Sequence, residues 1–174
     1  VAALAARYRE VKWLTGGATL VLPPEGSAVT LAPDSQRPPA PWPAAVAAAG
    51  RRSRVEGPPG GVGGTALYLS ADEVDALHAE FRSSVPAADF AHVVWTYDAA
   101  PVGATCQAGA PCPVLLVWEP RAGTSALEPV VRLTHPETGE WARTMAFHYP
   151  PEQWAVGDLV LDQLVLEIPL ELPA

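Results

Sequence analysis

The only two cysteines of the chain, Cys106 and Cys112, lie in the stretch TCQAGAPCPVLLVWEP. Two thiols at this spacing suit three kinds of chemistry: a disulfide, half of a metal site, or a redox pair. The residues between them include Gly109 and Pro111, and a turn there would bring the cysteines to the Cα separation of about 5–6 Å that a disulfide needs. The spacing is not that of a known redox motif. We predict a disulfide, and with it an oxidising compartment.

Two alternatives for the cysteines stay open: free thiols, and a metal site completed by His92 or His135. Structural zinc takes four ligands, and nothing in the spacing of these histidines requires a metal. The glycine-rich segment GPPGGVGG lacks the lysine and the serine or threonine that a phosphate-binding loop uses, so we read it as a linker. The sequence therefore predicts no metal and no cofactor.

Nucleophilic or acid–base catalysis needs a placed set of partners, and the sequence shows none. There is no GxSxG motif. His148 is interpreted as a solvated histidine on a strand face, and His78 as a packed residue at the apolar border of a helix. The carboxylates that could pair as acid and base are Glu137 with Glu140 and Asp158 with Asp162. Because acids at turns are usually solvated, we predict no catalytic residue and a protein that is not an enzyme.

Six tryptophans give the best remaining binding signal. Trp95 and Trp118 have apolar neighbours and are expected in the core. Trp42, in PAPWPA, is a candidate anchor of an extended arm, either to this chain or to a neighbouring subunit. The residues that could form a platform for stacking on a sugar are Trp141, Tyr149 and Trp154.

Charge is distributed unevenly along the 174 residues. Residues 1–86 carry eight acids and eight bases, whereas residues 87–174 carry eleven acids and three arginines, which accounts for the net charge of −8. So acidic a chain disfavours binding to nucleic acids and to anionic membranes. The absence of asparagine and the single lysine indicate a GC-rich genome.

Twenty prolines and fourteen glycines favour many short strands over long helices. The opening VAALAARYRE is either the remnant of a removed signal or membrane segment, or the first turns of a short helix. Next, ATLVLPPEGSAVTLAP predicts a hairpin with a Pro-Gly turn, and residues 33–64 predict an extended arm rich in Pro, Ala and Gly. A helix should begin after Ser70, because Ser70 and Glu73 form a capping-box pattern, and it should end before Pro86.

The remaining elements are expected to be strands. CPVLLVW is apolar on both faces, as a central strand would be, and EPVVRLTH alternates, with Val131 and Leu133 inward. In DLVLDQLVLEIPLELPA, Pro169 places the run at a sheet edge or at a break, because proline donates no ladder hydrogen bond. The residues of this run that share one apolar face, and so are candidate assembly contacts, are Leu164, Leu166, Ile168, Leu170 and Leu172.

Residues 97–173 resemble the extracytoplasmic C-terminal β-sandwich module of bacterial multi-spanning membrane glycosyltransferases. The likeness rests on a Tyr-Asp start, the strand LLVWEP, the turn in VVRLTHPETGEW and a closing YP…W…GD.V.D…L.IP..LP run. Its matched closing residues are Tyr149, Pro150, Trp154, Gly157, Asp158, Val160, Asp162, Ile168, Pro169, Leu172 and Pro173. The Gly-x-Tyr ending of that module is absent. The resemblance implies a β-sandwich outside the cytoplasm and carries over no catalytic residue.

These observations predict a mainly β protein, an antiparallel β-sandwich of immunoglobulin-like or jelly-roll type with one amphipathic helix and a Pro/Gly-rich arm. Residues 1–64 would form the hairpin and arm, and residues 65–174 the helix and sandwich core. The expected function is a non-enzymatic structural or interaction subunit of an extracytoplasmic assembly that associates through its arm and an edge strand. Protein partners or self-association are expected, and a membrane only through a removed or neighbouring anchor. The alternatives are a carbohydrate-binding module and a jelly-roll coat subunit of a virus-like particle.

Overall fold

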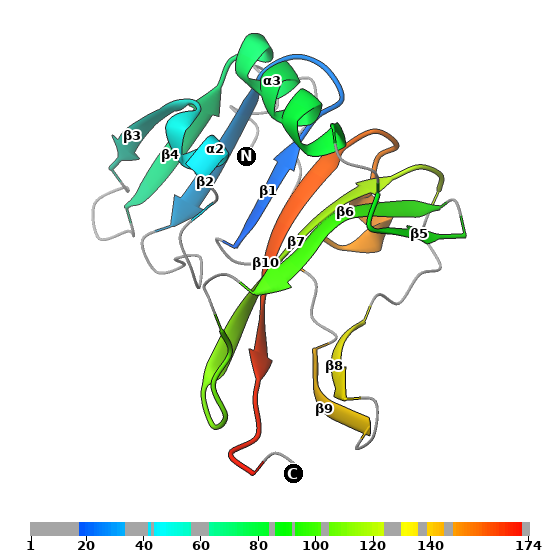
Figure 1. Cartoon of the computed structure of the whole chain (residues 1–174). Helices are drawn as coiled ribbons and strands as arrows, with labels where there is room; N and C mark the ends of the chain where they lie inside the picture. Colours follow the sequence, from blue (N-terminus) through cyan, green and yellow to red (C-terminus); the bar gives the residue numbers. More distant parts are fainter. Residues whose placement is uncertain are drawn as a thin grey trace.

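The computed structural model shows a mainly β protein whose strands pair in antiparallel sheets, which confirms the expected fold class (Figure 1). It describes residues 18–33, 42, 44–56, 63–83, 86–91, 93–101, 105–123, 130–135, 139–144 and 148–171. The elements are β1 (Thr19–Leu22), β2 (Ala28–Pro33), α2 (Ala44–Ala48), β3 (Arg51–Val55), β4 (Gly64–Leu69), α3 (Ala71–Arg82), β5 (Ala88–Phe90), β6 (Val94–Pro101), β7 (Pro111–Pro120), β8 (Val131–His135), β9 (Gly139–Thr144), a 3₁₀ turn (Pro151–Gln153) and β10 (Leu159–Glu167). The expectations for VAALAARYRE and for Leu172 lie outside the described residues.

The largest sheet has the strand order β1-β10-β7-β6-β5. As predicted, β7 is central, because its residues are apolar on both faces and both faces are covered. The last apolar run lies between β1 and β7 only as far as Asp162; from Leu164 to Glu167 it pairs with β7 alone among the described residues, so this part is an edge, as predicted. The strand ends at Glu167, two residues before Pro169, so the proline marks a break in the ladder.

A second sheet has the order β2-β4-β3. The predicted N-terminal hairpin is wrong, because β1 pairs with β10 and β2 pairs with β4, so the two strands of the supposed hairpin belong to different sheets. Pairing with β10 buries Leu20 and Leu22 in the main core of the protein, which explains why β1 does not pair with its sequence neighbour. The prediction of an extended arm over residues 33–64 is also wrong in the described part of that segment, which contains α2 and β3. Strands β2 and β3 both pair with β4, which begins at Gly64.

Helix α3 begins as predicted. The Ser70 side chain accepts the backbone N–H of Glu73, and the Glu73 carboxylate accepts the N–H of Ser70 at 2.7 Å. Glu73 also accepts the N–H of Gly50 at 3.0 Å, which ties the turn before β3 to the start of the helix. Gly50 has a φ of +75°, and a Cβ there would lie 2.6 Å from the carbonyl oxygen of Tyr68. Only glycine fits this turn.

The main core lies between one face of the large sheet and a layer formed by α2, α3 and the small sheet (Figure 1). Val74 and Leu77 of α3 are buried there, and Phe81 packs beside them, as their helical spacing predicts. The opposite face of the large sheet carries two smaller apolar clusters, one around Trp118 and one around Cys112. Val131 and Leu133 of β8 pack onto the cluster around Cys112 and Arg132 points outward, which confirms the predicted alternation.

Candidate functional site

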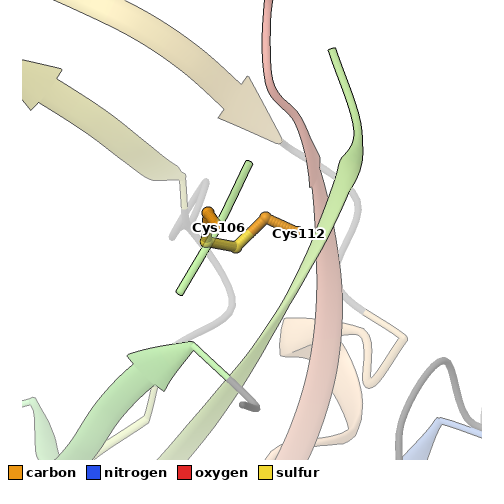
Figure 2. Close-up of a disulfide and its surroundings, with 2 residues drawn as sticks. All are labelled: Cys106 and Cys112. Carbon is orange, nitrogen blue, oxygen red and sulfur yellow. A yellow bond between two sulfur atoms is a disulfide. The ribbon is translucent and has the colours of Figure 1, made fainter. Parts of the chain in front are cut away.

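Cys106 and Cys112 form a disulfide across a turn, as predicted, with their Cα atoms 5.2 Å apart (Figure 2). The turn also bonds to the end of β10, because the N–H of Gly109 lies 3.1 Å from the carbonyl oxygens of both Ile168 and Pro169. The N–H of Ile168 in turn donates to the Ala110 carbonyl. The disulfide therefore holds a loop that continues the pairing of β7 with β10.

The predicted sugar platform does not form around Tyr149, because this side chain is fully buried. Its hydroxyl donates to the Asp158 carboxylate at 2.9 Å and contacts the carbonyl oxygen of Gln153. The centres of the Trp154 and Trp118 rings lie 4.1 Å apart. The Nε1–H of Trp154 donates to the Tyr149 carbonyl at 2.8 Å. Tyr149 thus offers no face to a ligand. Trp141 lies in β9, and its side chain lies outside the described part of the molecule.

Most of the expected assembly contacts belong to the core of this chain. Leu164, Leu166 and Ile168 are 1%, 4% and 6% exposed, and Leu166 and Ile168 pack in the cluster around Cys112. Trp42 packs against the main core, so it anchors its segment to this chain. Among the described residues of the final run that were expected to meet a partner, Leu170 is the exposed one, at 78%.

A buried carboxylate at the end of β7 was not singled out from the sequence. Glu119 has no exposed surface, and three side chains donate to it: Tyr97 at 2.6 Å, Arg82 at 2.8 and 3.2 Å, and Arg121 at 2.6 Å. Burial alone would raise the pKa of Glu119, but these hydrogen bonds lower it below its ordinary value. The same environment raises the pKa of Tyr97 to about 12, through burial and then through its bond to Glu119. Glu119 is therefore an anion that joins α3 to the large sheet.

A second buried carboxylate, Asp162, holds a histidine. Asp162 accepts the Thr19 hydroxyl at 2.6 Å and lies 2.9 Å from Nδ1 of His148 and 3.2 Å from its backbone N–H. The bond to Asp162 raises the pKa of His148. Reading His148 as a solvated histidine is thus wrong, because the imidazole is bonded and partly buried. Asp158, the other acid of the predicted pair, binds Tyr149 instead.

His78 is packed, as expected, and 5% exposed. Its Nε2 lies 2.7 Å from the carbonyl oxygen of Pro23, so Nε2 carries the proton and Nδ1 is an unprotonated acceptor. Burial lowers the pKa of His78. The ring is neutral and fixes the loop after β1 to α3.

The polar residues just described position structural elements and offer no assembled catalytic set. The oxygens of Glu119 and Asp162 accept hydrogen bonds from side chains and backbone of this chain. Among the described residues, no group of three or more His, Cys, Asp or Glu side chains could hold a metal ion.

The most distinctive surface feature is strand β3, RRSRV, in which all five residues are exposed. It forms one edge of the small sheet and pairs only with β4 in the described part of the chain. Val55 of β3, 42% exposed, and Leu31 of β2, 51% exposed, are apolar side chains on the outer face of that sheet. The sequence predicts the residues of β3 within the extended arm, although the Gly50 turn and three arginines in five positions could have marked an edge strand.

No family model, curated protein or solved structure matches this chain. Within the described residues, no helix is both long enough and apolar enough to cross a membrane. The fold and site define a mainly β protein with one disulfide and a basic sheet edge that no strand covers in the described part of the chain.

Proposed function

We propose that this protein is a non-enzymatic interaction subunit of a larger extracytoplasmic assembly, and that it docks through the open edge and outer face of the small sheet. The observation that carries the proposal is that all five residues of β3 are exposed. An edge strand presents unpaired backbone N–H and C=O groups, and natural proteins pair such edges with partner strands. The surface includes the exposed apolar residues Leu31 and Val55.

Two observations support an extracytoplasmic location. The disulfide between Cys106 and Cys112 is a bond that persists in oxidising compartments. The likeness of residues 97–173 to an extracytoplasmic β-sandwich module agrees with that location. The docking route differs from the one the sequence predicts, because the terminal strand and Trp42 are committed to this chain's own core.

Site-specific photo-crosslinking in the native source tests the proposal. A photoreactive side chain at Ser53, in the middle of β3, should give a discrete high-mass adduct. The same group at Asp72 is the matched control, because this residue is also exposed but lies on α3. Adducts of equal yield at both positions would show non-specific capture. No adduct from Ser53 or from Leu31 would overturn the proposal.

A further inference from the structure

We infer that β3 binds an acidic, extended segment of a partner protein by strand addition; this inference rests on the proposed function and names the chemistry of its partner. The first step is geometric. β4 occupies one side of β3, with Arg51 opposite Tyr68 and Val55 opposite Gly64. In the described part of the chain, the other side of β3 has no paired strand. A five-residue edge is long enough for an added strand to form several ladder hydrogen bonds.

The second step is charge. Three of the five side chains of β3 are arginines, in a protein whose net charge is −8. Alternation along the strand places Arg52 and Arg54 on one face and Arg51 on the other, where its guanidinium lies 5.3 Å from the centre of the Tyr68 ring. Side chains directly opposite one another on paired strands interact, and opposite charges stabilise the pair. An acidic residue of an added strand would therefore meet Arg52.

The same charges oppose pairing between two copies of β3. In an antiparallel pair centred on Ser53, Arg52 of each copy would lie opposite Arg54 of the other, and like charges directly opposite destabilise a sheet. Charged edges are a known device against self-association. The arginines thus favour an acidic partner strand by attraction and disfavour a second basic strand by repulsion, and both effects contribute to specificity.

The test uses a fluorescent peptide of alternating glutamate and valine, with anisotropy measured at low and at physiological ionic strength. Two control peptides separate charge from strand addition. One has lysine in place of glutamate, and the other keeps the glutamates but has N-methyl groups on alternate backbone nitrogens. We expect only the glutamate peptide to bind, and its binding should weaken as the salt concentration rises. The backbone amides of β3 that face away from β4 should then exchange hydrogen more slowly.

Variants of exposed arginines locate the binding. Arg52→Gln should weaken binding roughly threefold and Arg52→Glu about tenfold, the range expected for cross-strand charge pairs. Arg132→Gln is the control, since it removes an arginine that is also exposed but lies on β8, and it should leave binding unchanged. A thermal melt of each variant checks folding, which an exposed side chain should not alter.

Three results would overturn the inference. Equal binding of the N-methylated peptide would show charge attraction without strand addition. Equal effects of Arg52→Gln and Arg132→Gln would place binding elsewhere. No binding of the glutamate peptide would mean that the arginines only block self-pairing. If crosslinking at Ser53 persists in any of these cases, the proposed function stands and only the acidic chemistry of the partner is wrong.

Discussion

The guanidinium of Arg82, the last residue of α3, lies 2.8 Å from the fully buried carboxylate of Glu119 in β7. Arg121 reaches the same oxygen from the other side at 2.6 Å, and its guanidinium also lies 4.2 Å from the centre of the Trp95 ring. Arg82 further donates to the carbonyl oxygen of Gly157, just before β10. One carboxylate therefore connects the helix to two central strands of the large sheet.

Replacing Glu119 with glutamine should lower the free energy of unfolding at neutral pH by about 2 kcal/mol, because hydrogen bonds to a charged group are lost. The partly exposed arginines can still be solvated, which limits the loss. Because the folded pKa of Glu119 is lowered, its stabilisation is present above the ordinary value of 4.5 and is lost as the pH falls through the lower folded value.

Urea denaturation at several pH values measures this effect. Glu80→Gln is the matched control, since Glu80 is an exposed acid on α3. This substitution should change the free energy of unfolding by less than about 0.5 kcal/mol. Equal stabilities for Glu119→Gln and Glu80→Gln would contradict a structural role for the buried carboxylate.

His148 and His78 should titrate on opposite sides of 6.5. Asp162 raises the pKa of His148, whereas burial lowers that of His78. The contribution of His148 to stability is full below 6.5 and is lost as the pH rises through its raised folded pKa. The neutral form of His78 is the native one, so its contribution is present above 6.5 and is lost as the pH falls through its lowered folded pKa.

NMR titration of the imidazole protons checks both directions. Asp162→Asn should lower the pKa of His148 towards its ordinary value and leave His78 unchanged, since His78 lies on α3 and contacts Pro23. A His148 pKa that does not respond to Asp162→Asn would refute the pairing. Coincident titration of the two rings would refute their different environments.

Reducing the disulfide should lower the free energy of unfolding by about 2 kcal/mol, the chain-entropy value for so short a loop. The effect should also be local, because the loop holds the N–H of Ile168 to the carbonyl of Ala110. Hydrogen exchange should accelerate at Ile168. It should stay slow at Gln163 of β10, whose N–H donates to the Ala18 carbonyl at 2.9 Å. Unchanged exchange at both amides after reduction would show that the disulfide does not support the end of β10.

Leu164 and Leu170 were expected to share a face that meets a partner, and the structure separates them. Leu164→Ala should cost about 3 kcal/mol of unfolding free energy, since it leaves a cavity in a buried strand. Leu170→Ala should cost less than about 0.5 kcal/mol, because the side chain is mostly exposed. Chemical denaturation of the two variants compares them directly, and a similar cost for both would mean that the final run is not core.

Local interactions explain what could be predicted. The capping box of Ser70 and Glu73 spans three residues, so the start of α3 is encoded within one turn of sequence. The disulfide closes a loop of a few residues, and the alternation of Val131 and Leu133 reflects the two-residue period of a strand. The central position of β7 follows from its apolar character on both faces.

Pairing between distant segments decided the rest. Thr19 lies opposite Asp162 only because β1 joins β10, and that contact makes Asp162 a buried partner of both Thr19 and His148. Likewise, nothing in the sequence around Glu119 distinguishes it from other acidic residues. It accepts a hydrogen bond from Arg82 only because α3 packs close to β7. The sequence alone determined a mainly β chain with one capped helix and a disulfide, because short-range geometry and periodicity specify these features. The tertiary structure alone decided which strands are central and which edge stays open, because those depend on complementary burial between segments far apart in the chain.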